Sequence, residues 1–423
     1  MSRAMKDSGI PWIGEIPKDW ETDRAKTIFV QSTTKGNERL VLQSATQDKG
    51  VVDKDTIEGV VQVAADADLR TFKTVHIDDF VISLRSFQGG FEICHNEGVI
   101  SPAYTVFRLR KKSYTGYYRL LFKSYGFIDK INSLTVGIRE GKNIQYRDFA
   151  DMEIPIPSEV EQQRIAEFLD RKCGEIDEAI ALQEEFIEEL KSYKQSVITE
   201  TVTRGLNPNV KFKDSGIDWI GKIPENWIIV QTKRIVHNHL QGYYDADGYV
   251  MSGYRLLRIT DLLDNGNLTL KNAPFVKETP NIKEFVLQKG DFCFARTGGA
   301  GCFGFVSEDI EPAVFASYLI RFRFSGQNNN FLRYYFLSYS FISEVNSSVH
   351  GGVNKNIHAE NIKETHLPIP PLTEQQQIAD YLDKKCAEID GLIAIKQQKI
   401  EELKDYKKSI IYEYVTGKKE VNG

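Results

Sequence analysis

Two stretches of the chain place an apolar residue at alternating intervals of four and three positions. The first runs from Leu169 to Thr201 and the second from Leu382 to Tyr414. Seven of ten such positions are apolar in the first stretch, and eight of ten are apolar or aromatic in the second. This spacing predicts two long helices with coiled-coil seams. The seam positions expected to contact another helix or a partner are Leu169, Ile176, Ile180, Ile187, Leu190, Leu382, Ile389, Ile393, Ile400 and Leu403.

Outside these stretches the pattern changes to alternation of β-branched or aromatic residues with polar ones, bounded by Gly-rich turns. It predicts strands at Asp79–Arg85, Tyr104–Arg108, Asp291–Arg296 and Tyr318–Phe324. Two aromatic stretches, Tyr117–Tyr125 and Phe331–Phe341, have helical spacing. Each part of the chain that precedes a long helix is therefore expected to be a mixed α+β domain.

The chain is an internal duplication. The block Lys6–Trp20 returns as Lys213–Trp227, an offset of 207 residues, and Ile154–Leu190 returns as Leu367–Leu403, an offset of 213. Between the matched blocks each copy carries about 130 to 140 residues that differ much more. Two reading domains of different specificity fit this pattern better than neutral drift of two inserts on a duplicated fold.

The order of the repeated blocks predicts that the chain closes on itself. Val202–Gly205 runs directly into the second block, whereas its counterpart Val415–Gly417 lies at the C-terminus, far in sequence from the first block. Joining the ends would require antiparallel helices and would place Lys6–Trp20 beside Tyr414–Lys418. Closure would also bury apolar residues of the first block. The alternative is that this block packs only on its own insert.

Composition describes a globular protein. The 423 residues are 41% hydrophobic and 27% charged, with no low-complexity tract. No apolar run is long enough for a membrane span, and the start lacks the apolar run of a signal peptide, so a cytoplasmic location is expected. The five cysteines form no CxxC pair, which argues against a zinc site and predicts reduced thiols.

The net charge of −5 does not by itself indicate a nucleic-acid binder. The two helical stretches, residues 159–200 and 373–414, carry −7 and −2, which leaves +4 for the rest of the chain. Acidic charge is therefore concentrated in the helices.

Two polar loop sets recur at matching positions in the two inserts. Arg and Lys suit guanine, Asn and Gln suit adenine, and hydroxyls suit phosphates. Solvated surface loops share this composition, but recurrence favours DNA contact. The candidate DNA-binding residues are Arg85, Ser86, Gln88, Arg139, Lys142, Asn143 and Gln145 in the first insert, and Arg296, Thr297, Asn354, Lys355, Asn356 and His358 in the second.

Two other motifs favour ordinary structure over chemistry. Gly299–Gly304 formally matches GxGxxG, but Phe303–Val306 continues as a strand, so a hairpin turn is expected there. His237 and His239 have no Cys or acidic cluster around them, which favours a strand end over a metal pair. No catalytic residue and no metal ligand is predicted.

The ordered set of KDSGIPWIGEIPKDW, the IPIP…EQQRIAEFLD…EID segment and the duplicate of each resembles the conserved regions of type I restriction-modification specificity subunits. The resemblance covers the whole chain. It implies a non-catalytic subunit with two target-recognition domains, each of which reads one half of a bipartite, asymmetric DNA site. It also implies assembly with two methyltransferase subunits and with restriction subunits.

The chemistry of such a complex is expected in the partners. The chain lacks the Asn/Asp-Pro-Pro-aromatic tetrapeptide of amino-methyltransferases and the GxxxxGK[ST] phosphate loop. No cofactor is expected in this chain, whereas S-adenosylmethionine, ATP and Mg are expected in partner subunits. The alternative function is a stand-alone DNA-binding or anti-restriction protein that keeps the duplicated fold.

The predicted fold is α+β, with two pseudo-symmetric target-recognition domains separated by an antiparallel two-helix coiled coil. The expected order is domain 1 at 1–157, helical spacer 1 at 158–204, domain 2 at 205–370 and helical spacer 2 at 371–417. A helix pair of about 32 residues would measure on the order of 48 Å and could set the spacing between half-sites. An ordinary hairpin that mediates dimerisation is the other interpretation.

Overall fold

The computed structural model describes residues 3–36, 39–46, 49–56, 68–82, 90–110, 113–134, 144–244, 248–297, 301–348 and 356–421. The chain divides into two units. Unit 1 combines Met1–Gln183 with Gln398–Gly423, and unit 2 is Glu184–Gln397. Each unit therefore contains part of both long helices.

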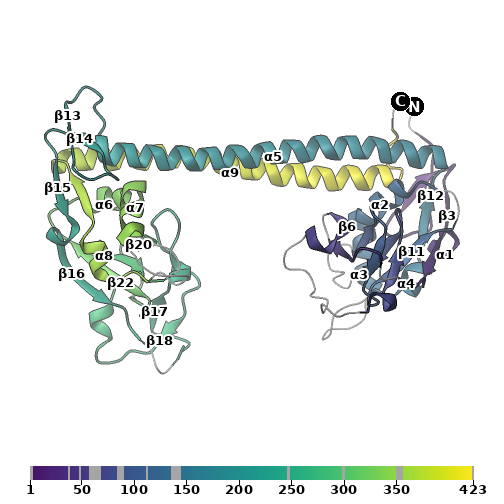
Figure 1. Cartoon of the computed structure of the whole chain (residues 1–423), viewed down its shortest axis with the longest axis horizontal. Coiled ribbons are helices and arrows are strands. Elements are labelled where there is room, and N and C mark those ends of the chain that lie inside the picture. The colour runs from purple at the N-terminus through teal and green to yellow at the C-terminus, as the bar shows by residue number, and fades with distance from the viewer. Residues whose placement is uncertain are drawn as a thin grey trace. The chain divides into compact units, whose positions relative to one another are not determined.

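The long helices are α5, Glu159–Arg204, and α9, Leu372–Val415 (Figure 1). Ser158 caps the start of α5, since its hydroxyl accepts from the Glu161 N–H at 3.3 Å. Gly205 and Gly417 follow the two helices with φ of +75° and +71°, the left-handed conformation that ends helices at low cost for glycine.

The helices are antiparallel neighbours within each unit. In unit 1 Lys407 donates to both oxygens of Asp177 at 2.6 Å. In unit 2 Lys194 donates to both oxygens of Asp390 at 2.7 Å. Asp390 lies 213 positions after Asp177 and Lys407 lies 213 positions after Lys194, so the same ion pair is made twice. The predicted antiparallel arrangement is confirmed by these contacts.

The two units share one core architecture. A four-stranded antiparallel sheet has the order β4-β11-β8-β9 in unit 1 and β16-β22-β19-β20 in unit 2. The strands of unit 1 are β1 Met5–Asp7, β2 Glu15–Pro17, β3 Glu21–Arg24, β4 Phe29–Ser32, β5 Gln43–Thr46, β6 Gly50–Asp53, β7 Lys73–Val75, β8 Phe80–Ile82, β9 Phe91–Ile93, β10 Gly98–Ile100, β11 Thr105–Leu109 and β12 Glu153–Ile156. Those of unit 2 are β13 Phe212–Asp214, β14 Lys222–Pro224, β15 Ile228–Gln231, β16 Val236–Gln241, β17 Tyr254–Leu257, β18 Phe275–Val276, β19 Phe292–Ala295, β20 Phe303–Phe305, β21 Ala313–Phe315, β22 Leu319–Phe324 and β23 His366–Ile369.

Short helices cover the sheets. They are α1 Ala25–Ile28, α2 Thr115–Lys123, α3 Tyr125–Leu134 and α4 Tyr146–Ala150 in unit 1, and α6 Asn329–Leu337, α7 Tyr339–Ser348 and α8 Ala359–Lys363 in unit 2. The 3-10 helices are Lys54–Thr56, Leu69–Thr71, Thr232–Arg234, Ile259–Asp261 and Ile282–Phe285. Each aromatic stretch predicted as one helix is interrupted, at Ser124 in unit 1 and at Ser338 in unit 2. Both residues have extended backbone angles, and the hydroxyl of each donates to the carbonyl three residues earlier at 2.6 Å.

A fully buried tryptophan joins the repeated N-terminal block to the start of the adjoining long helix in each unit. Trp20 donates its indole N–H to Glu161 at 2.8 Å, and Trp227 donates to Glu374 at 3.1 Å. The remainder of each core is mainly aromatic and aliphatic residues of the four-stranded sheet and its covering helices.

The predicted closure of the chain is confirmed within unit 1. The Tyr412 hydroxyl donates to the carbonyl oxygen of Trp12 at 3.0 Å, and the Lys418 ammonium donates to that of Glu15 at 2.5 Å. Gly417 lies so close to Pro17 that an added Cβ would come within 2.3 Å of its Cδ. The last residues of α9 thus complete the same structure that Val202–Gly205 completes in unit 2.

Candidate nucleic-acid interface

One edge of the unit 2 sheet brings together the predicted loops. Strands β16 and β19 both end there, at Gln241 and Ala295, and the antiparallel strand β22 begins there at Leu319. Because neighbouring antiparallel strands alternate in direction, the segments that follow β16 and β19 and the segment that precedes β22 must lie side by side. We call this group of segments the reading edge of unit 2.

Backbone hydrogen bonds join the segments of this edge. The Arg296 N–H donates to the carbonyl of Tyr318 at 2.9 Å, and the Arg296 carbonyl accepts from the Ile357 N–H at 2.7 Å. Gly242 N–H donates to the carbonyl of Leu319 at 3.0 Å. Arg296 and Thr297 are therefore held beside Asn356 and His358, although some 60 residues separate the two pairs in sequence.

The side chains at this edge match those used to contact DNA. Arg296 and Thr297 are half-buried, whereas Asn356 and His358 are exposed. His358 precedes α8, and its N–H donates to the side-chain oxygen of Asn361 at 2.9 Å, which fixes the start of that helix. Side chains held by a rigid sheet edge lose less conformational freedom on binding than side chains of a free loop.

Sequence reasoning missed an aromatic residue of the reading edge. Tyr318 was predicted as the first residue of a strand, but it precedes β22 and is 62% exposed. Tyr244, which follows β16 by three residues, is also exposed. Tyrosine side chains are among those that contact the phosphates of duplex DNA, so these exposed residues suit the reading edge. Both tyrosines lie between strands rather than within one, and the hydropathy pattern could not predict this position.

Unit 1 has an equivalent edge where β4 ends, β8 ends and β11 begins. The polar loop after β8, with Arg85, Ser86 and Gln88, lies outside the described residues, and so do Arg139, Lys142 and Asn143. Gln145 is exposed at the start of α4, at the position that corresponds to His358. In unit 2, Asn354 and Lys355 also lie outside the described residues.

Two lysines add positive charge near the unit 1 edge. Lys35, beyond the end of β4, is exposed and bridges through its backbone to Lys73. The Lys73 ammonium donates to the carbonyl oxygen of Tyr104, immediately before β11, at 2.5 Å. Burial lowers the pKa of Lys73, because removing water disfavours the charged ammonium.

An ion pair between a half-buried arginine and a buried aspartate lies at the opposite end of each sheet. Arg108 donates to Asp79 at 2.7 Å in unit 1, and Arg323 donates to Asp291 at 2.6 and 3.1 Å in unit 2. Burial raises the pKa of Asp79, against the opposing effects of the His76 N–H and Arg108. A buried pair of this kind is costly to break, because the remaining partner is left uncompensated. The duplicated pairs therefore favour rigid support for both reading edges.

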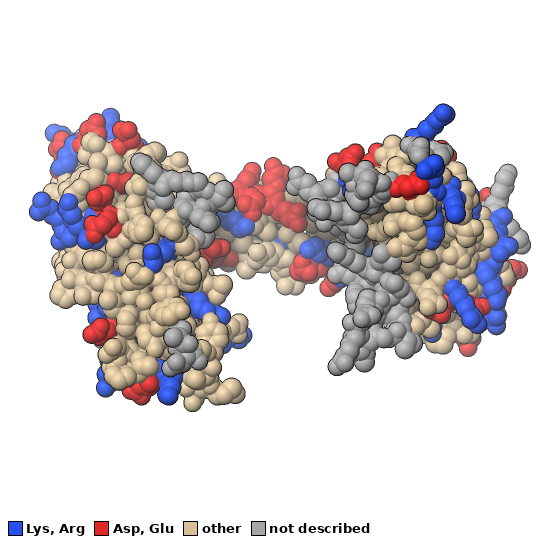
Figure 2. Space-filling view, turned by 60° about the horizontal axis from the view of Figure 1, so that its bottom comes forward, with Lys and Arg blue, Asp and Glu red and all other residues tan. Residues whose placement is uncertain are grey.

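The coiled-coil seam is buried along the predicted positions. The side chains of Leu169, Ile176, Ile187, Leu382, Ile389 and Ile400 are buried, and those of Ile180, Leu190, Ile393 and Leu403 are half-buried. Figure 2 shows Asp and Glu side chains gathered over the helices. The exposed acidic residues of α5 include Glu184, Glu185, Glu188 and Glu189. Since acidic side chains repel phosphates, this helical surface does not suit DNA.

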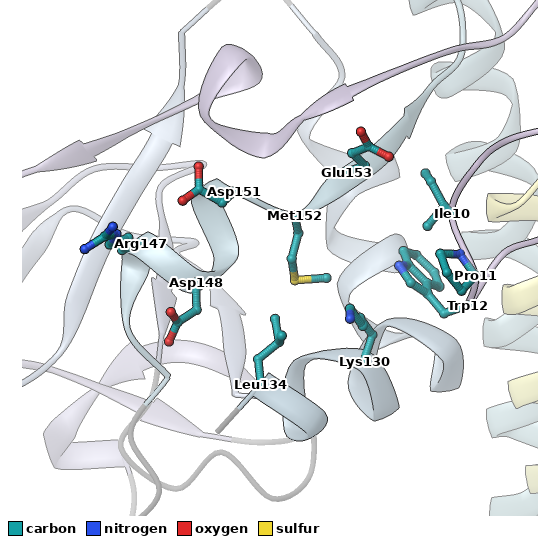
Figure 3. A pocket seen from close by; sticks show the side chains of 10 residues that line it. All are labelled: Ile10, Pro11, Trp12, Lys130, Leu134, Arg147, Asp148, Asp151, Met152 and Glu153. Atoms are coloured by element: carbon teal, nitrogen blue, oxygen red, sulfur yellow. The ribbon is translucent and has the colours of Figure 1, made fainter. Parts of the chain in front are cut away.

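Figure 3 shows a pocket of about 400 Å³ in unit 1. The side chain of Met152 extends into it near Leu134, and charged groups surround them. The Lys26 ammonium donates to Asp151 at 2.8 Å and lowers the pKa of that carboxyl. The lining contains no histidine, cysteine or serine; it consists of Ile10, Pro11, Trp12, Lys130, Leu134, Arg147, Asp148, Asp151, Met152 and Glu153.

The GxGxxG match and the two histidines belong to ordinary secondary structure in the described residues. Phe303–Phe305 is strand β20, paired antiparallel with β19, so the GxGxxG match is not followed by a helix. His237 and His239 lie within β16 rather than at its end. The ring of His239 stacks on that of Phe322, with the ring centroids 5.5 Å apart. The described residues contain no group of three or more potential metal ligands. All five cysteines are free.

Comparisons with known proteins agree with this geometry. Residues 256–405 match the family model of the type I restriction modification DNA specificity domain. The chain is 24% identical over 439 aligned positions to the putative type I restriction enzyme MjaX specificity subunit of Methanocaldococcus jannaschii, which covers 96% of this chain and 95% of the relative. Over almost its whole length the chain is therefore similar to type I specificity subunits.

Further relatives carry the same designation. The MjaVIII specificity subunit of Methanocaldococcus jannaschii is 28% identical over 284 residues, which cover 65% of this chain and 64% of the relative. The chain thus spans slightly less than two thirds of that protein. The EcoKI specificity subunit of Escherichia coli is 25% identical over 68% of this chain and 62% of its own length. These relatives are named specificity subunits, which agrees with the prediction that the chain is not itself the enzyme.

Solved structures show the same fold. A chain from a study of complex assembly and conformational transition in a type I restriction-modification system aligns with a TM-score of 0.71 at 14% identity, covering 95% of this chain and 99% of that chain. The HsdS subunit of Thermoanaerobacter tengcongensis aligns with a TM-score of 0.52 at 16% identity, covering 95% and 98%. The predicted α+β class with long antiparallel helices is confirmed. None of the described helices is long and apolar enough to cross a membrane.

Proposed function

We propose that this specificity subunit reads a bipartite, asymmetric DNA site, one half with each unit. The observation that carries the proposal is the sheet edge built twice on the same strand order, with different side chains at the two copies. Because the two sheets have the same strand order, they position the two edges alike. The side chains at the two edges differ, which gives the edges different base preferences. The candidate DNA-binding residues of both units belong to this proposal.

The long helices are proposed to set the distance between the half-sites. Helix α5 is continuous across the boundary between the units at Gln183, and α9 is continuous across the boundary at Gln397. Helices of 46 and 44 residues extend about 69 and 66 Å at a rise of 1.5 Å per residue. They are longer than the 32 residues of the seam because both helices begin about ten residues before it.

The subunit is also proposed to dock two methyltransferase subunits and, through them or directly, restriction subunits. Each unit exposes an apolar pair at equivalent helix positions: Leu182 and Tyr406 in unit 1, Ile395 and Tyr193 in unit 2. Exposed apolar side chains outside a satisfied seam favour contact with another protein. Their duplication suits two copies of one partner. S-adenosylmethionine, ATP and Mg would act in those partners, in the cytoplasm where the DNA target lies.

Replacement of Arg296 by alanine tests the reading edge. In the complex with methyltransferase, R296A should weaken binding to the target duplex about 10- to 100-fold and relax base preference in one half-site only, the loss typical of a base-reading arginine. Binding is measured on duplexes that carry each base pair in turn at every position of the motif.

Arg234 provides the matched control. It is an exposed arginine in the 3-10 helix that precedes β16, at the end of the sheet opposite to the reading edge. R234A should keep the affinity and the base preference of the natural chain. Equal behaviour of R296A and R234A would show that this edge does not read DNA.

A further inference from the structure

The two units differ at one place where the repeated N-terminal block, a short helix and a long helix meet. In unit 1 this place is occupied by Tyr412 of α9. Its ring packs on Tyr125 with centroids 4.3 Å apart, and its hydroxyl donates to the carbonyl oxygen of Trp12 at 3.0 Å. The chain therefore fills this position with an aromatic side chain of its own.

Unit 2 leaves the same position open. Thr199 of α5 stands where unit 1 has Tyr412, 213 residues later in the sequence. A pocket of about 580 Å³ lies there. Its aromatic walls, Trp219 and Tyr339, are 42% and 60% exposed. The rest of the lining is mainly polar and consists of Ser192, Gln195, Ser196, Thr199, Glu200, Thr203 and Arg204 of α5 together with Ile220 and Ser340.

The change is matched on the facing helix. Gly126 leaves room for the Tyr412 ring, since an added Cβ would come within 2.8 Å of Tyr412 Cε2. Unit 2 has Ser340 at the corresponding position, and its hydroxyl donates to the carbonyl of Trp219 at 2.6 Å. Thr199 in turn accepts from the Tyr339 N–H at 3.0 Å. The hydroxyls of Thr199 and Ser340 are therefore hydrogen-bonded, and the aromatic rings of Trp219 and Tyr339 stay exposed beside them.

We propose that this pocket of unit 2 receives an aromatic side chain of the methyltransferase subunit that docks on α5. Unit 1 shows that an aromatic side chain packs between walls of this kind. The incoming side chain does not need a hydroxyl like that of Tyr412, because the Ser340 hydroxyl already donates a hydrogen bond to the Trp219 carbonyl. The pocket begins one residue before the exposed Tyr193, so it continues the apolar surface assigned above to partner docking. This inference rests on the proposed function.

The test transplants the unit 1 arrangement into unit 2. The double variant T199Y/S340G should fill the pocket from within, keep the chain folded and bury Trp219 and Tyr339. In the natural chain the copy on unit 2 should bind more tightly than the copy on unit 1, because only unit 2 offers the open pocket. Titration of T199Y/S340G with the methyltransferase subunit, followed by native mass spectrometry, should instead show two copies of equal and weaker affinity. Loss of an aromatic anchor typically weakens binding by about 30-fold or more, here for the copy on unit 2.

The control is T199V, which removes the hydroxyl that accepts from Tyr339 without filling the pocket and should keep the tighter binding of the copy on unit 2. Unchanged affinities of folded T199Y/S340G would overturn the proposal, and so would equal weakening of both copies or loss of a restriction subunit alone. If the double variant does not fold, W219A/Y339A, which removes the exposed walls, must show the same weakening of one copy, and unchanged affinity overturns the proposal. Failure of the natural chain to bind any methyltransferase would instead contradict the proposed function.

Discussion

Exchange of residues 21–153 for the corresponding insert of a relative with a different target will replace one half of the methylated motif and leave the other half unchanged. The two ends of this insert are neighbours, since β12 pairs with β3 and Glu153 lies opposite Arg24. The exchanged part therefore begins and ends on one pair of strands. Sequencing the methylome of a host that expresses the hybrid chain with its methyltransferase gives the result directly.

The matched exchange is residues 228–366 of unit 2, bounded by β15 and β23, which pair in the same way. It should change the other half of the motif. Each insert contributes to a separate hydrophobic core, one in unit 1 and one in unit 2, which is why independent effects are expected. A single exchange that altered both halves of the motif would show that the two domains are energetically coupled and would refute independent reading.

Lengthening both long helices by seven residues, after Gln183 in α5 and after Gln397 in α9, should widen the spacer of the recognised site by about three base pairs. Seven residues preserve the seam register and add about 10 Å of helix. The half-sites themselves should stay the same, because neither reading edge is touched. The methylated motif of the extended chain reports both effects.

Two-residue insertions at the same two positions are the control. They turn the following half of each helix by about 200°, so that the seam residues face away from the partner helix, and they should abolish methylation or greatly reduce it. A seven-residue variant that methylates efficiently with the original spacer would show that the helices do not set the distance.

The repetitive parts of this fold were predictable from sequence because their signals are periodic. Seam residues such as Leu169 and Leu382 follow from spacing alone, and the antiparallel closure follows from the order of the repeated blocks. The strands at residues 80–82, 105–109, 292–295 and 319–324 lie at or within one residue of predicted ranges, apart from the segment after Ile82, which lies outside the described residues.

The parts that could not be predicted depend on single contacts between distant segments. Nothing in the hydropathy pattern distinguishes Ser124 or Ser338 from a helical residue, yet each separates two helices. The exposure of Tyr318 follows from strand order, and the open pocket in unit 2 follows from one residue pair, Thr199 and Ser340, that replaces Tyr412 and Gly126. Such differences become meaningful only when the two halves are compared in three dimensions.

The most direct test of the central claim is single-molecule methylome sequencing of a host that carries this chain with its methyltransferase subunit. Two differently reading units predict a methylated motif made of two unlike half-sites separated by a spacer of fixed length without base preference. A continuous motif, or a perfectly palindromic one, would contradict the claim that the two units of this chain read different halves of one site.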